Sequence, residues 1–319
     1  MFNFLELKED IFGLDLSGSS LKIVNLKKKR KGFELISLGE TEIPENLMEN
    51  GIIKDEDALV KIIKSTIKSI KGQKIKTKYI VASLPEEKSF LQVIQMPKME
   101  KRELALAVSL EAENYIPLPI EEVYLDFYTV PSVEKNSNHI EVIMVAMPKK
   151  IIDSYVSCFK KAGLTPIIFE TESFAMIRSL IKKDEKNSSL ALINIGKNDA
   201  NFIIFSGNFI RFSCSIPVSL NEETKTEFAK QIDKYLNFYC DHSSYENPSN
   251  SQEINKILIC GEGSILKDLP EFLSKKLKIS IELSNPLINF SSKKTKLLKE
   301  KNILSFATVI GLAMRENNI

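Results

Sequence analysis

The sequence contains the same order of secondary-structure signals twice. Each copy has three short apolar runs separated by turn residues, then an amphipathic helix, then a compact apolar strand. In the first copy the runs lie at residues 11–16, 21–26 and 33–38, and the final strand lies at 79–84. In the second copy they lie at 189–195, 201–205, 209–216 and 257–260, and a further helix is predicted at 264–277. An internal repeat in a chain of 319 residues predicts an α/β fold whose two halves face each other across a cleft.

The segment between the two copies has no counterpart in the second copy and predicts an inserted subdomain. It contains extended runs at 89–96, 123–130 and 140–147, with a helix between the first two. Pro117 ends that helix, because proline lacks an amide donor and disfavours helical geometry at Ile116.

Local signals also mark where elements begin and end. Asp55 is expected to cap the helix of the first copy, and Gly163 is expected to end the helix that follows the insertion. We expect a first domain at 1–180 with an inserted subdomain at about 86–148, a second domain at 188–290, and a C-terminal helix at 300–319 that returns to the first domain.

Composition excludes several classes of function. The 44 Lys and Arg residues nearly balance the 42 Asp and Glu residues, so composition gives no electrostatic case for nucleic-acid binding. The four cysteines stand singly beside only two histidines, so we expect reduced thiols and no zinc site. The longest apolar runs, at 142–148 and 306–314, are shorter than the roughly 20 residues that a membrane-spanning helix needs. We therefore expect a cytoplasmic protein.

Polar turns at matched positions of the two copies predict a phosphate-binding site. The first strands end in Asp15 and Asn194, and each is followed by a tight turn containing Gly or Ser. Such turns direct backbone amides and hydroxyls at phosphate oxygens, and the Asp15 carboxylate suits a hydrated Mg²⁺. A third turn follows the strand at 257–260, and its glycines allow close approach of a ligand ring. The predicted nucleotide-binding residues are Asp15, Ser17, Gly18, Ser19, Ser20, Lys22, Asn194, Gly196, Gly261, Gly263 and Ser264, with Asp15 at the metal.

This arrangement resembles the actin-like ATPase superfamily, which includes actin, heat-shock chaperone ATPases, sugar kinases and FtsA. Its phosphate hairpins typically read D-[IL]-G-x-x-[ST]. More narrowly, the insertion sequence EAENYIPLPIEEV at 111–123, followed by Leu125-Asp126-Phe127, resembles the PilM family of bacterial type IV pilus assembly proteins. The resemblance covers about residues 12–315. It implies a duplicated actin-like (ribonuclease H-like) fold, with two β-β-β-α-β-α halves around a cleft and a small α+β insertion in the first half.

The resemblance also implies a scaffold function. PilM-like proteins form a ring or collar, a homo-oligomer, at the inner face of the cytoplasmic membrane beside other pilus platform and motor proteins. They bind the cytoplasmic N-terminal tail of a PilN-like single-pass membrane protein, and they bind ATP with Mg²⁺ in the cleft with little turnover. The apolar residues offered for the tail groove are Leu91, Val93, Leu104, Val108, Tyr115 and Ile116, which equally suit the core of the inserted subdomain.

The chain departs from the family pattern mainly around the nucleotide. Asn194 replaces an aspartate, and Asp199 stands where a hydroxyl would contact phosphate, so its carboxylate would repel the triphosphate. Glu262 occupies a position in the third turn that is usually small, and the A-E-x-x-K-like motif that contacts the nucleoside is missing. We therefore expect weak, altered or lost ATP binding, no catalytic residue, and a degenerate ATPase that acts as a scaffold.

Two alternatives remain open from the sequence. An active actin-fold ATPase or small-molecule kinase needs an acid over the cleft, and Glu170 or Glu172 would supply it, although both also suit the start of a helix. An FtsA-like division protein usually carries a membrane-targeting helix beyond a linker, which the tail at 315–319 is too short to provide.

Overall fold

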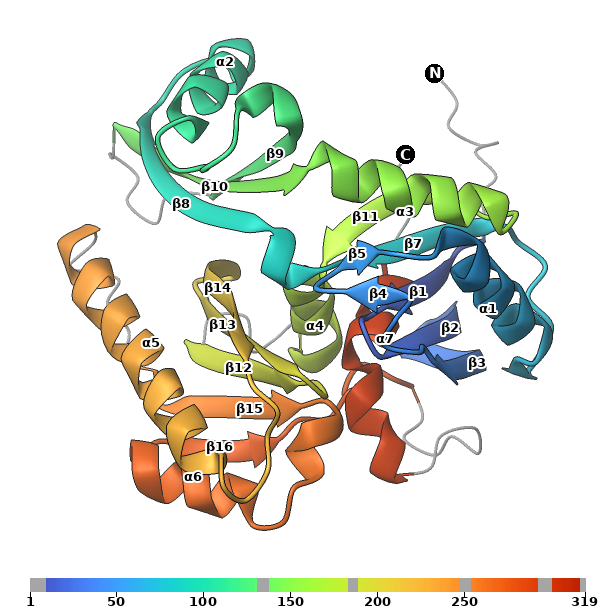
Figure 1. The fold of residues 1–319 in the computed structure, drawn as a ribbon. Helices are drawn as coiled ribbons and strands as arrows, with labels where there is room; N and C mark the ends of the chain where they lie inside the picture. The colour runs from blue at the N-terminus through green and yellow to red at the C-terminus, as the bar shows by residue number, and fades with distance from the viewer. Residues whose placement is uncertain (1–9, 131–137, 183–188, 247–253, 292–299, 316–319) are drawn as a thin grey trace.

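The computed structural model describes residues 10–130, 138–182, 189–246, 254–291 and 300–315. Two halves are each built on one mixed sheet, and helices α4 (Glu172–Leu180) and α7 (Ala307–Ala313) lie between them (Figure 1). The strands of the two sheets pair in the same order and directions. The duplicated actin-like fold expected from the sequence is therefore confirmed.

The first half contains a sheet with the order β11-β7-β1-β2-β3-β6. Its strands are β1 (Phe12–Leu16), β2 (Ser20–Lys29), β3 (Gly32–Glu42), β6 (Lys71–Gly72), β7 (Tyr79–Leu84) and β11 (Thr165–Thr171). Strand β1 is antiparallel to β2 and parallel to β7. Helices α1 (Glu56–Lys68) and α3 (Lys149–Lys161) pack on one face of this sheet, while α4 and α7 pack on the other (Figure 1).

The second half repeats this pattern with the order β14-β13-β12-β15-β16. Its strands are β12 (Leu190–Ile195), β13 (Asp199–Ser206), β14 (Phe209–Pro217), β15 (Lys256–Cys260) and β16 (Ser280–Leu283). Helices α5 (Lys225–Glu246) and α6 (Leu269–Leu277) cover its outer face. The prediction that a helix begins at residue 264 is wrong, because α6 begins only at Leu269. A 3₁₀ turn occupies Glu262–Ile265, and Asp268 has a left-handed conformation (φ +57°) directly before α6.

The inserted segment forms a separate three-stranded sheet with the order β8-β10-β9. Its strands are β8 (Phe90–Pro97), β9 (Val123–Val130) and β10 (His139–Pro148), and helix α2 (Lys101–Ala112) covers one face. Strand β8 packs against β14 of the second half, where Arg211 donates to Glu141 at 2.6 Å. A short hairpin of β4 (Met48–Glu49) and β5 (Ile52–Ile53) lies beside the cleft.

Candidate functional site

The two halves enclose a cleft with a cavity volume of about 360 Å³. It lies where β1 and β12 end in their polar turns. Eight of the eleven predicted nucleotide-binding residues line it: Asp15, Ser17, Gly18, Ser19, Lys22, Asn194, Gly196 and Gly261. The matched turns of the sequence repeat are thus brought to opposite walls of one cavity.

The first turn is closed by its own hydrogen bonds. The Ser17 amide donates to the Ser20 carbonyl at 3.0 Å, and the Ser20 amide donates to Ser17 Oγ at 3.2 Å. Ser20 is buried behind the wall and does not line the cavity, so its predicted ligand contact stays a prediction. Asp15 is also buried, and its carboxylate accepts a hydrogen bond from the Ser83 hydroxyl at 2.7 Å.

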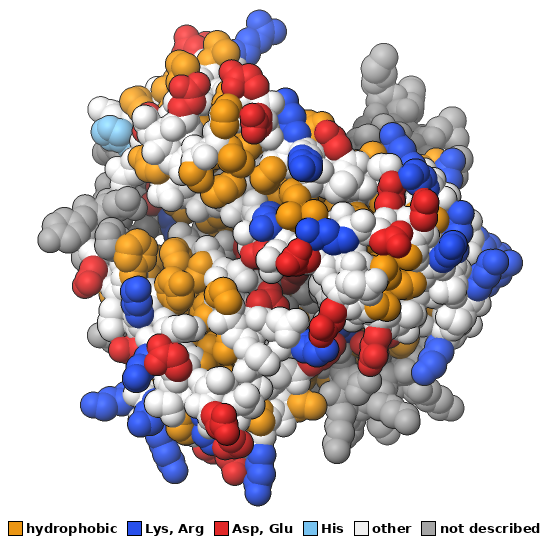
Figure 2. Space-filling view, in the orientation of Figure 1, with side chains coloured by type: hydrophobic (Ala, Val, Ile, Leu, Met, Phe, Trp, Pro, Cys, Tyr) orange, Lys and Arg blue, Asp and Glu red, His pale blue; other side chains and the backbone are white. Residues whose placement is uncertain are grey.

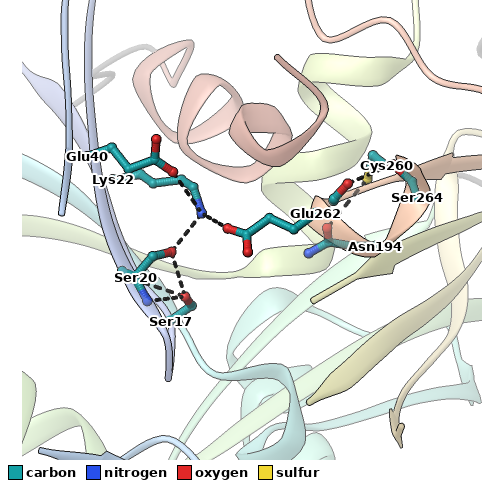
Figure 3. A network of polar contacts seen from close by, with 9 residues as sticks. Ser17, Ser20, Lys22, Glu40, Asn194, Cys260, Glu262 and Ser264 are labelled. Atoms are coloured by element: carbon teal, nitrogen blue, oxygen red, sulfur yellow. Dashed lines mark hydrogen bonds and ion pairs between the residues drawn. The ribbon is translucent and has the colours of Figure 1, made fainter. Parts of the chain in front are cut away.

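Lys22 on β2 carries its ammonium group to this wall of the cleft. The side chain is 6% exposed, and Nζ donates to Ser20 Oγ at 2.7 Å. Nζ also lies 3.1 Å from Glu262 Oε1 and 3.7 Å from Glu40 Oε1 (Figure 3). Glu262 belongs to the second half, so this ion pair joins the two walls.

The second turn presents an amide and a carboxylate. The Gly196 amide donates to the Asp199 carbonyl at 2.8 Å, which closes the turn. Asn194 Oδ1 accepts a weak hydrogen bond from the Cys260 thiol at 3.7 Å. Burial raises the pKa of the Asp199 carboxyl, which lies in the cleft lining where the family pattern has a hydroxyl.

The third turn is shaped by packing against β12. Gly261 has φ +89°, and a Cβ on Gly263 would overlap the side chain of Ile195. Ser264 is buried and its hydroxyl donates to the Gly261 carbonyl at 2.6 Å. Gly263 and Ser264 do not line the cavity, and the structure gives them a role in the turn itself, while their ligand contacts stay a prediction.

Acidic side chains dominate the described lining of the cleft. Figure 2 shows acidic side chains gathered at the hollow in the middle of this face. The lining contains two lysines, Lys22 and Lys197, against seven carboxylates: Asp15, Glu45, Glu49, Glu87, Glu172, Asp199 and Glu262. Burial, together with the neighbouring carboxylates, raises the pKa of Glu172 well above its usual range, and burial raises that of Asp15 despite the opposing attraction of Lys22.

The structure separates Glu170 from Glu172. Glu170 is buried and forms a bidentate ion pair with Arg178, with N–O distances of 2.7 and 2.8 Å. It also contacts Arg315 at 2.7 Å. Glu172 begins α4 and lines the cleft, where its Oε2 accepts from Asn201 Nδ2 at 2.6 Å. Glu170 is therefore a structural residue, and only Glu172 of the pair faces the candidate site.

Three residues of the cleft lining, Glu45, Thr308 and Asn201, carry no signal in the sequence. Glu45, after β3, accepts from Lys197 at 2.8 Å across 152 positions of the chain. Thr308 at the start of α7 and Asn201 on β13 also line the cavity. Only the folded arrangement brings these segments together.

The residues predicted for a tail-binding groove lie in different environments. Leu104, Val108 and Ile116 are buried in the core of the inserted subdomain, so their assignment to an open groove is corrected. Leu91 packs against the cluster between α4 and the second sheet. Val93 is half-buried on β8, and Tyr115 is 47% exposed.

Strand β9 presents an edge that pairs with no other strand among the described residues. Tyr124 and Tyr128 alternate along one face of β9 and are 46% and 44% exposed. The Tyr124 hydroxyl donates to Asp153 on α3 at 3.1 Å, and the Tyr128 ring lies 5.9 Å from that of Phe174 on α4. This edge therefore borders the junction between the inserted sheet and the first half (Figure 1).

A sequence comparison decides the family. A family model described as "Type IV pilus assembly protein PilM" matches residues 13–217 and 217–317. The chain belongs to the PilM family. The resemblance inferred from the inserted motif is confirmed.

Comparison with solved structures agrees on the fold. A chain of a structure described as a PilM–PilN type IV pilus biogenesis complex is 22% identical, with a TM-score of 0.81 over 97% of this chain and 98% of that one. The cytoplasmic domain of EpsL, from the type II secretion system of Vibrio cholerae, is 10% identical, with a TM-score of 0.52 over 96% and 95% of the two chains.

A curated relative outside the PilM family also matches. Cell division protein FtsA of Bacillus subtilis is 24% identical over 281 residues. The match covers 78% of this chain and 61% of FtsA, so this chain spans less than two thirds of that protein.

The described residues contain neither a metal-binding cluster nor a membrane-spanning helix. No group of three or more His, Cys, Asp or Glu side chains is placed to hold a metal ion. Within the same residues, the helices are all too short or too polar to cross a membrane.

Proposed function

We propose that this PilM-family chain is a scaffold of type IV pilus assembly that binds the cytoplasmic N-terminal tail of a PilN-like single-pass membrane protein. The observation that carries the proposal is the family match over residues 13–317, which includes the whole inserted subdomain. The similar fold of a PilM determined in complex with PilN supports the choice of partner.

The unpaired edge of β9 is the surface that best suits such a tail. An extended peptide adds to an exposed strand edge through main-chain hydrogen bonds, while side chains on alternate residues give specificity. The opposite edge strand, β8, packs against β14, whereas the outer edge of β9 pairs with no strand among the described residues. Tyr124 and Tyr128 supply large apolar surfaces beside it.

Fluorescence anisotropy with a labelled peptide of the partner's tail tests the proposal. We expect Tyr128→Ser to weaken binding at least about tenfold, since aromatic anchors dominate peptide interfaces. Leu106→Ser is the matched control, because Leu106 is 71% exposed on the face of α2 opposite the buried Leu104 and Val108, which face the inserted sheet. Equal affinity of Tyr128→Ser and the unmodified protein would refute the placement, and absence of binding by the unmodified protein would refute the function.

Location and assembly belong to the same proposal. A PilN-like partner would hold the chain at the inner face of the cytoplasmic membrane, next to other platform and motor proteins, and a ring or collar would form from copies of the chain. Cell fractionation with and without the partner, and light scattering of the purified protein, test these two statements.

We also propose that the cleft binds Mg-ATP weakly or not at all and that the chain is not an enzyme. The excess of carboxylates in the lining supports this, because a triphosphate carries several negative charges and needs compensating cations. Asn194 and Asp199 weaken the second phosphate turn further. The residues present therefore do not fit a bound triphosphate.

Calorimetric titration with Mg-ATP, together with a phosphate-release assay, tests this part. Micromolar affinity with steady turnover would support the alternative of an active actin-fold ATPase or kinase, with Glu172 as the acid in the cleft. The division-protein alternative rests on the match to FtsA and predicts no affinity for a pilus-protein tail.

A further inference from the structure

The ammonium group of Lys22 is the cation on the first wall of the cleft, and protein groups already surround it. The lysine side chain is 6% exposed. Its three nearest polar partners are the hydroxyl of Ser20 at 2.7 Å and the carboxylates of Glu262 at 3.1 Å and Glu40 at 3.7 Å (Figure 3). Nζ therefore donates hydrogen bonds to Ser20 and Glu262, and the Glu40 carboxylate adds an ion pair beyond hydrogen-bond distance.

Glu262 reaches Lys22 from the opposite half of the molecule, 240 positions further along the chain. Its backbone is held on both sides. The Gly261 amide donates to the Leu304 carbonyl at 2.9 Å, and the Ser264 hydroxyl donates to the Gly261 carbonyl at 2.6 Å. Because these bonds fix the turn, the glutamate side chain starts from a defined point and extends across the cleft.

The Glu262 carboxylate therefore stands where an anionic ligand would meet the lysine. An incoming phosphate would have to displace this carboxylate, and the displaced carboxylate would remain nearby as a like charge. The Lys22 charge is compensated without any ligand, and both atoms of the ion pair belong to the same chain. An intramolecular anion has a high effective concentration and competes well against a free one.

We propose that Glu262 is an internal substitute for phosphate that excludes nucleoside phosphates from the cleft and joins its two walls in their absence. The proposal deepens, and rests on, the scaffold function proposed above, in which nucleotide binding is weak or lost. Glu262 is the residue that determines this specificity, and Lys22 is the residue through which it acts.

Binding of a fluorescent ATP analogue with Mg²⁺ to the full chain tests the proposal. We expect Glu262→Gln to bind at least about tenfold more tightly than the unmodified protein, because the variant removes the competing charge and leaves Lys22 for phosphate. Glu262→Gly, which shortens the side chain to its backbone, should give the same gain. Glu34→Gln is the matched control, since it removes an exposed ion pair of the first half, with Lys29 at 2.8 Å, whose residues do not line the cleft, and it should leave affinity within about twofold.

Small-angle X-ray scattering without nucleotide supplies a second readout. Glu262→Lys should increase the radius of gyration, because two like charges would then face each other across the cleft, whereas Glu40→Gln should not, because Glu40 lies on the same half as Lys22. The proposal is overturned if neither Glu262→Gln nor Glu262→Gly gains affinity, or if Glu34→Gln gains as much. Tail-peptide affinity measured on the same variants separates the two proposals, since its absence would refute the scaffold function and leave the nucleotide result standing.

Discussion

Gly13 on β1 is the position where a single methyl group should most directly disturb the wall that carries Asp15. A Cβ at Gly13 would lie 2.5 Å from the Val309 carbonyl oxygen and 2.7 Å from the Ala313 amide nitrogen, both on the backbone of α7. Backbone atoms cannot rotate away as a side chain can, so we place the overpacking cost of Gly13→Ala near the upper end of the usual range, about 3 kcal/mol. Alanine also removes the entropic disadvantage of a strand glycine, a gain of about 1 kcal/mol. The net expectation is a loss of about 2 kcal/mol of unfolding free energy.

Thermal unfolding followed by calorimetry or circular dichroism measures this loss. About 2 kcal/mol corresponds to a fall in Tm of about 4 to 8 °C for a domain of this size. Gly18→Ala is the matched control, because a Cβ at Gly18, five residues further along the same segment, meets nothing within 4 Å. If the Gly13→Ala and Gly18→Ala variants unfold at the same temperature, the close packing of α7 on β1 does not contribute the expected unfolding free energy.

Three further predictions concern charge and capping. Burial raises the pKa of Glu172 in the folded state, so the folded protein keeps a proton above the unfolded value of 4.5, and stability falls as pH rises above about 5. Glu172→Gln, which keeps an oxygen acceptor for Asn201, should flatten that fall in Tm. Arg211→Ala and Glu141→Ala should show a coupling of about 1 kcal/mol in a double-mutant cycle of unfolding, as both side chains are largely buried at their 2.6 Å contact; additive effects would contradict it. Asp55→Ala should lower the free energy of unfolding by about 1 kcal/mol, since the Asp55 carboxylate accepts a hydrogen bond from the Ala58 amide at 3.0 Å. An unchanged Tm would show that this cap does not stabilise α1.

Features that depend only on residues close together in the sequence were predictable. Asp55 caps α1 as expected, and Gly163 follows α3 with φ +85°. The strands of both copies fall close to the predicted runs, since alternation of apolar residues and turn chemistry are local signals. The duplicated topology was predictable because the strands of the two copies occur in the same order along the sequence.

Features that depend on what covers a surface were not predictable. Leu104 and Val108 were expected at a groove or in a core, and they lie in the core because the β8-β10-β9 sheet covers that face of α2. An apolar helical face shows that something packs on it, but not whether it is the same chain or a partner. The contact of Lys22 with Glu262 was equally hidden, because no local pattern relates residues 240 positions apart.

The contacts between the two halves also determine the position of the inserted sheet. Strand β8 packs against β14, and Arg211 joins β14 to Glu141 on β10, so the inserted sheet is attached to the second half as well as to the first. The ion pairs of Lys22 with Glu262 and of Lys197 with Glu45 hold the same two halves together at the cleft. Opening the cleft would therefore displace β14 relative to the inserted sheet or break the contact of Arg211 with Glu141. If Glu262 substitutes for phosphate as proposed, the chain keeps this geometry without a ligand. The β9 edge proposed for the tail would then keep one orientation relative to the second half.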